Sequence, residues 1–313
     1  MLGDYYVNGA VILSTSIRKH NSLSDANIDL VCMVTPDVSE NAIRLLYNYY
    51  DRVVRVQFIF NHTECKTEKQ TSIYGPWINV CFTKWNVFAL DEYAKIMFLD
   101  SDVLVVGSIL ELLDYETPAG IMDTDHNAGR GAQDTKGAVS VQEISRRLQR
   151  FQPVMDATCL VIEPSKSSWR EMQEMLYKNE FFSNKNPSGP DEVLLAQHCA
   201  YKKQEIHKLP KEFGLTFWKN AERTGGAKIL NFRGTKPWDN DNADSSWEDV
   251  RIWQSYVTDE IRDRLVEHGI PKSKVKYSMD RMDNRVVLMV ERQRFFLMYR
   301  QLVAAPLQVL LKR

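Results

Sequence analysis

The chain has 313 residues, of which 44% are hydrophobic and 26% are charged, and its formal net charge is -1. This length suits one large α/β domain with an extension, or two modest domains, and the composition excludes an intrinsically disordered chain. Because the net charge is close to zero, the chain has no general attraction for nucleic acid or anionic membranes, and we expect neither as a partner.

Five cysteines are widely spaced and lie mostly within apolar runs. This pattern predicts free, buried thiols rather than a disulfide framework or a zinc site, and it indicates a reducing compartment. No apolar run approaches the roughly 18 residues that a membrane span needs, and no secretory signal is recognisable. We therefore expect a cytoplasmic protein.

Strands and helices alternate along most of the chain. Apolar periodicity predicts elements in this order: a helix at 8–21, a strand at 28–34, a helix at 37–49, a strand at 53–59, a helix at 83–93, strands at 96–99, 103–106 and 158–162, and helices at 169–181, 192–199 and 258–268. Asp37, with Glu40 three residues later, indicates a capping box for the second helix. The alternation predicts an α/β fold with a mostly parallel sheet flanked by helices.

After Trp238 the sequence becomes rich in Asp and Asn and then predicts helices only. We therefore place a domain boundary near residue 240, with a first domain at 1–240 and a helical C-terminal extension at 241–313. The stretch 281–313 combines arginines with apolar residues that spread around the predicted helix. A helix packed on the first domain fits this spread better than a basic helix lying on a membrane.

The sequence Asp100-Ser101-Asp102 directly follows the apolar run 96–99, so both carboxylates leave the carboxyl end of a buried strand. Open α/β sheets place their ligands there. Two carboxylates this close repel each other unless a cation neutralises them, and oxygen ligands suit Mg²⁺ or Mn²⁺ carrying a diphosphate. The alternative is a simple turn, which Asp and Ser also favour.

Other motifs strengthen the interpretation as a ligand site. They are YVNGAVILSTSIRKH at 6–20, Thr83-Lys84, YAKIMFLDSDVLVV around the acidic pair, Gly189-Pro190-Asp191-Glu192, and NFRGTKPW at 231–238. With these motifs in this order, the chain resembles the glycogenin-like retaining glycosyltransferases of family 8 over residues 4–238. The resemblance implies the GT-A fold, with a Rossmann-like mixed sheet. It also implies transfer of a hexose or similar sugar from a UDP-sugar donor.

The resemblance further implies roles for individual residues. The metal ligands for Mn²⁺, or for Mg²⁺, would be Asp100, Asp102 and Asn231. The catalytic residues would be Lys84, Asp191 and Glu192. The donor-binding residues would be Asp4, Tyr6, Lys84, Asp123, Asp156, Gly234 and Lys236. Among these, Asp191 would lie near the transferred sugar, where a carboxylate stabilises an oxocarbenium-like centre.

The chain departs from the family pattern at several positions. Asn231 stands where the family has a metal-binding histidine, so we expect weaker Mn²⁺ binding and good tolerance of Mg²⁺. Lys236 comes one residue early, and Glu192 replaces a glutamine. Only three residues precede Asp4, so we expect the family's first strand, which frames the nucleotide base, to be absent.

The acceptor is not identified by the sequence. No tyrosine lies at 211–230, where self-glucosylating members carry theirs, so we expect an external saccharide or protein acceptor. The long stretch 124–154 predicts part of an acceptor site, with Arg146, Arg147 and Arg150 facing an acidic or phosphorylated partner, although a solvated helix face is the alternative. Two other functions stay open: a non-catalytic relative that binds a nucleotide-sugar or a protein, and a metal-dependent nucleotide-sugar hydrolase. The oligomeric state also stays open, and a dimer is possible.

Overall fold

The structure is a computed structural model. It describes residues 3–24, 27–64, 75, 77–122, 137–178, 182–183, 189–216, 226–232, 236–239 and 247–271. All of these belong to one compact unit that spans Met1–Ser273. The predicted site residues Asp123 and Gly234, and the stretch 281–313, lie outside the described residues.

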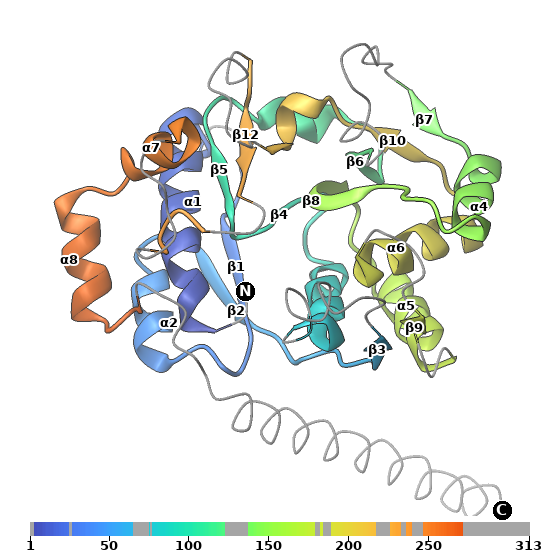
Figure 1. Ribbon diagram of the computed structural model, residues 1–313, viewed down its shortest axis with the longest axis horizontal. Helices are drawn as coiled ribbons and strands as arrows, with labels where there is room; N and C mark the ends of the chain where they lie inside the picture. The colour runs from blue at the N-terminus through green and yellow to red at the C-terminus, as the bar shows by residue number, and fades with distance from the viewer. Residues whose placement is uncertain are drawn as a thin grey trace, which may run out of the picture. The chain divides into compact units, whose positions relative to one another are not determined.

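Figure 1 shows how the elements are arranged. The α-helices are α1 (Val7–His20), α2 (Glu40–Leu46), α4 (Val141–Gln149), α5 (Lys166–Lys178), α6 (Pro190–Tyr201), α7 (Glu248–Gln254) and α8 (Asp259–Glu267). The 3-10 helices are η1 (Asp4–Tyr6), η3 (Ile78–Ala89), η4 (Leu110–Asp114) and η6 (Lys211–Phe213). The strands are β1 (Val31–Val34), β2 (Arg52–Arg55), β3 (Thr63–Glu64), β4 (Ile96–Leu99), β5 (Val103–Val105), β6 (Ala119–Ile121), β7 (Ala138–Val139), β8 (Asp156–Ile162), β9 (Phe182–Ser183), β10 (Ile206–Lys208), β11 (Leu215–Thr216) and β12 (Ile229–Asn231).

The strands form mixed sheets. The largest has the order β4-β8-β6-β10-β7, in which β8 is antiparallel to both of its neighbours and β6 is parallel to β10. A second sheet has the order β11-β12-β5, with β12 parallel to β11 and antiparallel to β5. β1 and β2 form a separate parallel pair, as do β3 and β9. The fold is therefore mixed α/β, as the sequence predicts.

Strand β8 lies between two hydrophobic cores. All of its residues are buried, and from Cys159 to Ile162 successive side chains alternate between the cores because neighbouring residues of a strand point to opposite faces. Cys159 and Val161 pack into the first core, whereas Leu160 and Ile162 pack into the second, with η3, α4, α5 and α6. The apolar run that predicts this strand thus reflects burial on both faces.

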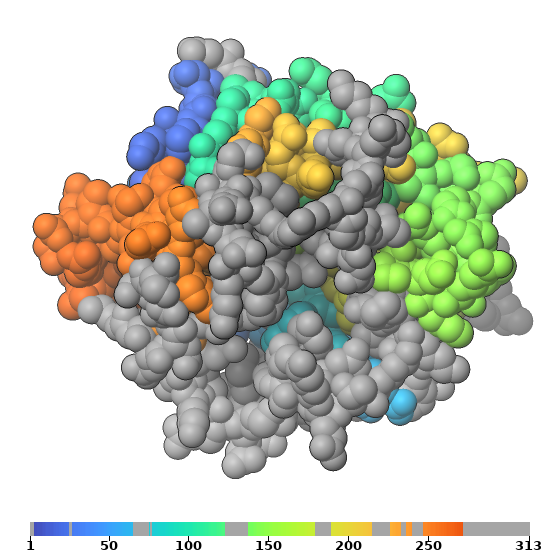
Figure 2. All heavy atoms as spheres, turned by 45° about the horizontal axis from the view of Figure 1, so that its top comes forward, coloured from blue at the N-terminus to red at the C-terminus, as the bar shows by residue number. Residues whose placement is uncertain are grey.

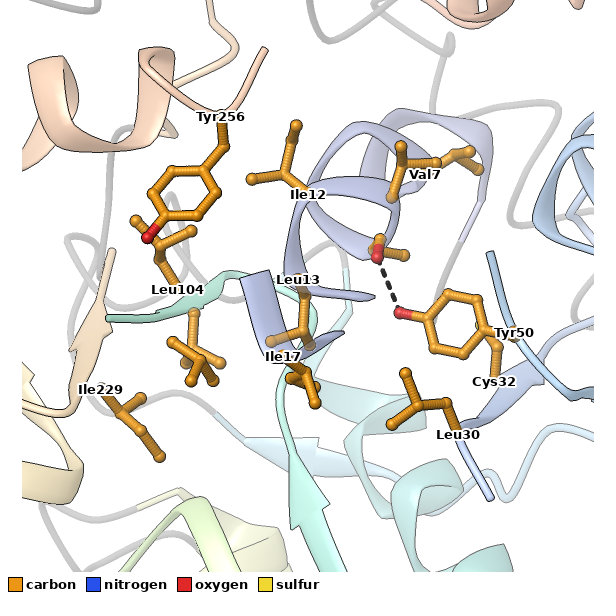
Figure 3. Close-up of a cluster of buried hydrophobic side chains, with 14 of the residues drawn as sticks. Val7, Ile12, Leu13, Ile17, Leu30, Cys32, Tyr50, Leu104, Ile229 and Tyr256 are labelled. Atoms are coloured by element: carbon orange, nitrogen blue, oxygen red, sulfur yellow. Dashed lines mark hydrogen bonds between the residues drawn. The ribbon is translucent and has the colours of Figure 1, made fainter. Parts of the chain in front are cut away.

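The first core surrounds α1 and takes in residues of β1, α2, β5 and β12. Figure 3 shows Ile12, Leu13 and Ile17 of α1 among the side chains of this core. The Tyr50 hydroxyl donates a hydrogen bond of 2.7 Å to the carbonyl of Ala10, so the polar end of this buried ring is satisfied by the helix itself.

Helices α7 and α8 and the turn between them contribute to the same core through Trp253, Tyr256, Ile261 and Leu265. The Tyr256 hydroxyl lies 2.8 Å from His20 Nε2 at the end of α1. Figures 1 and 2 show these two helices in orange on the side of the molecule that also carries the blue N-terminal segment. The domain boundary near residue 240 stays a prediction, but the helices that follow it share a core with α1.

Three predicted helix starts are wrong by three residues or more, and the simplest case is the helix predicted from residue 169, which begins at Lys166. Asp37 does not cap α2; instead Ser39 is the N-cap, and its Oγ accepts a hydrogen bond from the N–H of Ala42 at 3.2 Å. Asp37 accepts a hydrogen bond from the Thr35 hydroxyl, which takes its carboxylate away from the helix. The helix predicted from residue 83 is the 3-10 helix η3, which begins at residue 78. Its apolar residues lie on most sides, so the sequence has no clear period to mark its start.

The predictions about the cysteines and about membrane spans can be compared with the described residues. Cys32, Cys81, Cys159 and Cys199 are free and buried, as predicted, and Cys65 lies outside the described residues. Within the described part of the chain, the helices are all too short or too polar to cross a bilayer.

Candidate functional site

The acidic pair lies at the carboxyl end of β4, as the sequence predicts. Because β4 and β8 are antiparallel, this end of β4 meets the beginning of β8, and the N–H of Asp100 donates to the carbonyl of Thr158 at 3.1 Å. Just beyond the pair, Val103 of β5 is paired with Asn231 of β12. The ends of four strands, β4, β8, β5 and β12, therefore meet near residues 100–102.

Lys84 connects the acidic pair to the start of α6. It lies on η3, and its Nζ is 2.8 Å from Asp191 Oδ2 and 3.4 Å from Asp100 Oδ1. Burial alone would lower the pKa of Lys84, but the two carboxylates raise it well above its usual value. Three predicted site residues that are distant in the sequence thus form one charged cluster.

Asp100 is partly desolvated in this cluster. Burial raises the pKa of its carboxyl to about 7; Lys84 opposes this rise, and the negative charge of Asp102 adds to it. Lys84 therefore offsets only part of the effect of burial and of the neighbouring carboxylates on Asp100.

Asp102 has a lysine of its own. Lys236 Nζ lies 2.5 Å from Asp102 Oδ2 and also donates to the carbonyl of Phe232 at 2.7 Å. The N–H of Phe232 in turn donates to the Asp102 carbonyl at 3.0 Å. Lys236 and Phe232 of the last motif therefore both contact Asp102, and the predicted role of Lys236 in donor binding stays a prediction.

Thr158, which the sequence analysis did not single out as a site residue, links two predicted site residues. Its N–H and hydroxyl donate to Asp156 Oδ1 at 2.9 and 2.6 Å. Its hydroxyl oxygen accepts a hydrogen bond of 2.9 Å from Asn231 Nδ2. This leaves the amide oxygen of Asn231, the atom that a cation needs, outside that hydrogen bond. The available signal in the sequence was a polar residue at the start of the apolar run 158–162.

Glu192 and Asp4 have structural partners. Glu192 is the third residue of α6, and its two carboxylate oxygens accept from the N–H groups of Gly189 at 2.8 Å and Ala157 at 3.1 Å. Burial, with Asp156 and Asp191 nearby, raises the pKa of Glu192 well above its usual value. Asp4 Oδ1 accepts from the N–H of Ser39 at 2.7 Å. The catalytic role of Glu192 and the donor-binding role of Asp4 stay predictions.

Tyr6 lies beside the acidic pair. Its pKa is raised, first by burial and then by the charges of Asp102 and Asp100. Its ring centroid is 6.1 Å from that of Trp238, in an edge-to-face arrangement. Tyr6 is therefore positioned near the cluster, although its predicted contact with the donor stays a prediction.

Gly9 of α1 is a second position that the sequence analysis passed over. A Cβ at this position would collide with the backbone carbonyl of Ser101 and would approach Trp238 Cη2 to 2.7 Å. Only a residue without a side chain allows α1 to pack this closely against the acidic loop. The signal in the sequence was a glycine inside a helical pattern, which usually has a packing reason.

The comparisons agree with this geometry. The model of glycosyl transferase family 8 matches residues 1–242, which is most of the chain. The chain belongs to glycosyl transferase family 8. It is 22% identical over 306 residues to glycogenin-1 of Mus musculus, covering 88% of this chain and 79% of that protein. It is 23% identical to an uncharacterized protein of Acanthamoeba polyphaga mimivirus, covering 77% of this chain and 81% of the relative.

Among solved structures, this family 8 glycosyltransferase is similar to an active-site mutant of LgtC. The TM-score is 0.51 at 13% sequence identity, and the match covers 85% of this chain and 98% of LgtC. This likeness supports the GT-A type of fold.

Asp100 and Asp102 are the described residues that could hold part of a divalent-cation site. Within the described ranges, no three or more His, Cys, Asp or Glu side chains gather as a complete metal site. However, the side chains of Asp100 and Asp102 are 30% and 21% exposed, so both carboxylates can reach a ligand. One or two carboxylates, completed by phosphate oxygens and water, form a usual Mg²⁺ site, and Mn²⁺ accepts the same oxygen donors.

Proposed function

We propose that this family 8 glycosyltransferase moves a sugar from a UDP-sugar donor to an external acceptor, with retention of configuration and with Mn²⁺ or Mg²⁺ as cofactor. The observation that carries this proposal is the position of Lys84 between Asp100 and Asp191. It joins the carboxylate predicted to bind the cation to the carboxylate predicted to lie beside the transferred sugar.

Each part of the cluster matches a demand of glycosyl transfer. Asp100 and Asp102 would hold the cation, which would neutralise charge on the departing diphosphate. Lys236 would add a second positive charge there. The ammonium of Lys84 fixes the Asp191 carboxylate, which is buried at the start of α6. A carboxylate in that place stabilises positive charge at the reacting carbon of the sugar.

The acceptor is proposed to be a separate molecule, a saccharide or a protein. Helix α4, with Arg146, Arg147 and Arg150, is our candidate for part of the acceptor surface. Among these arginines, Arg147 is the weakest candidate for contact with an acceptor. It already donates to Glu143 Oε1 at 2.7 Å and to the carbonyl of Pro153 at 3.3 Å. Arg146 also pairs with Glu143, but its side chain is 46% exposed.

Turnover of radiolabelled UDP-sugars, with and without candidate acceptors, tests the function. A transferase consumes its donor much faster when the acceptor is present. Equal consumption without acceptor would indicate a hydrolase, and donor binding without consumption would indicate a non-catalytic relative. Asp191→Asn should lower kcat by at least about a hundredfold. Asp259→Asn, at an exposed position on α8, is the matched control and should leave kcat unchanged.

A further inference from the structure

Each carboxylate of the acidic pair is matched with a different lysine. Asp100 faces Lys84 at 3.4 Å, and Asp102 faces Lys236 at 2.5 Å. The two lysines come from different parts of the fold, since Lys84 lies on η3 and Lys236 lies beyond the end of β12. Lys84 is shared with Asp191, whereas Lys236 pairs with Asp102.

Lys236 is a fixed partner of Asp102 rather than a mobile surface lysine. It is only 7% exposed, and its Nζ is also held by the carbonyl of Phe232 at 2.7 Å. Its own carbonyl accepts from the N–H of Asp239 at 3.0 Å, and Trp238, between these two residues, is buried in the first core. Hydrogen bonds thus hold both the Nζ and the backbone of Lys236, and they keep its ammonium beside the Asp102 carboxylate.

We infer that Lys236 is a resident counter-ion of Asp102 that blocks the binding of a divalent cation until a nucleoside diphosphate is present. This inference rests on the proposed function of the site. Cation and diphosphate then bind cooperatively, and the cation alone binds weakly.

The physical reason is the balance of charge. A divalent cation at Asp102 must displace the Lys236 ammonium or lie beside it, and like charges a few ångströms apart repel strongly in a partly buried site. A diphosphate supplies new oxygen acceptors for the ammonium of Lys236. Lys236 can then leave the Asp102 carboxylate for the diphosphate, and the cation can bind Asp102. By linkage, the cation must strengthen diphosphate binding by the same factor as the diphosphate strengthens cation binding.

The exchange is assigned to Lys236 rather than to Lys84 because their partners differ. Lys84 is closer to Asp191, at 2.8 Å, than to Asp100, at 3.4 Å. Its shorter ion pair therefore remains when a cation binds Asp100. Lys236 has Asp102 as its carboxylate partner and would have to leave it.

The experiment measures Mn²⁺ binding to the full chain, by the loss of the electron paramagnetic resonance signal of free Mn²⁺, with and without UDP. In the wild type, UDP should tighten Mn²⁺ binding by at least about tenfold. Lys236→Met should tighten binding of Mn²⁺ alone by about tenfold and weaken binding of UDP alone. Lys236→Arg keeps the positive charge and should bind Mn²⁺ alone as weakly as the wild type.

Lys228→Met is the matched control. Lys228 precedes β12 and pairs with Glu111 and Glu212, so this substitution removes a positive charge from the same region without touching Asp102. It should leave Mn²⁺ binding unchanged. Circular dichroism and thermal melting identify variants that fail to fold, and Lys236→Gln replaces Lys236→Met in that case.

The outcomes separate this inference from the proposed function. If the wild type binds Mn²⁺ and UDP together but the uncharged variants gain no affinity for Mn²⁺ alone, the counter-ion role is wrong and the proposed function stands. Equal Mn²⁺ affinity with and without UDP would also overturn the inference. If the wild type does not bind Mn²⁺ with UDP at all, the proposed function itself fails.

Discussion

The rings of Trp238 and Trp253 pack against each other, with their centroids 5.8 Å apart. Trp238 ends the last motif of the site, two residues after Lys236, and Trp253 belongs to α7. Tyr5 packs on the same indole with a centroid distance of 5.7 Å. Helix α7 thus supports the segment that carries Lys236.

Trp253→Ala should remove this support. Deleting a buried indole should lower the free energy of unfolding by about 3 to 5 kcal/mol. It should also raise the KM for the donor, because Lys236 loses its fixed position. Trp247→Ala, at the half-buried start of α7, is the control and should be milder. Chemical denaturation and donor kinetics measure both effects; a loss of stability with an unchanged KM would limit α7 to a role in folding.

Gly9→Ala should disturb the acidic loop. In an open helix this change would stabilise by about 1 kcal/mol, but here the new methyl group meets the carbonyl of Ser101 and the ring of Trp238. We expect weaker binding of Mn²⁺ with UDP, measured by calorimetry. Gly107→Ala is the control, since the three atoms nearest to its Cβ would all belong to Lys228, at 3.3 Å or more. Wild-type binding by the Gly9→Ala variant would show that the loop tolerates displacement.

Asn231→His should increase the affinity for Mn²⁺ measured by calorimetry with UDP present. An imidazole nitrogen suits Mn²⁺ better than it suits Mg²⁺, so the half-saturating Mn²⁺ concentration should fall and tolerance of Mg²⁺ should decrease. Asn231 is buried beside Val103 and Thr158, so a thermal melt must first show that the larger ring is accepted. Unchanged Mn²⁺ affinity in a folded variant would remove Asn231 from the metal ligands.

Arg146→Gln with Arg150→Gln should raise the KM for an acidic acceptor and leave donor hydrolysis intact. Arg147 is retained because its hydrogen bonds to Glu143 and Pro153 hold the end of α4. Arg262→Gln, an arginine paired in the same way with Asp259 on α8, controls for a general loss of charge. A parallel loss of both activities would indicate damage to the donor site instead.

Stability should decrease as the pH falls below about 6.5, with a contribution from His198. This buried residue of α6 lies with its Nε2 3.0 Å from Oε2 of Glu171 on α5, and Lys202 contacts the same carboxylate. Burial lowers the pKa of His198 despite Glu171. The unfolded chain therefore takes up the proton more readily, and stability is lost as the pH falls through 6.5 toward the folded-state pKa.

Thermal melts of the wild type and His198→Gln between about pH 7.5 and pH 5.5 test this expectation. Glutamine keeps a hydrogen-bonding group toward Glu171 but does not titrate, so the variant should lose less stability than the wild type over this range. Parallel curves would show that His198 does not contribute. Using the difference between the two proteins removes the contributions of other titrating groups.

The sequence predicted the parts of the fold that local patterns encode. The run before Asp100 is apolar because β4 packs between two cores, and the run at 158–162 is apolar for the same reason. Thr258 caps α8 as predicted, since a cap depends on neighbours three residues away. Asp37 accepts a hydrogen bond from the Thr35 hydroxyl and does not cap α2, so the prediction placed the N-cap of α2 at the wrong residue.

The contacts within the site could not be predicted in the same way. Nothing in the residues near Lys236 shows that its ammonium meets Asp102, and nothing near Thr158 shows that it bridges Asp156 and Asn231. These contacts depend on the pairing of β4 with β8 and of β5 with β12. The resemblance to the family placed the residues in one site, but the assignment of partners needed the structure.

The pairing of β5 with β12 also has a consequence for how the protein is made. Lys236 and Asp102 are 134 residues apart in the chain. During synthesis the acidic pair leaves the ribosome long before the strand and the lysine that complete it. Until then the edge of β5 that pairs with β12 in the described sheet has no partner strand. Asp102 likewise lacks the ammonium of Lys236. The contact between Lys236 and Asp102 therefore forms only after most of the domain has been synthesised, and it requires the closure of a long loop.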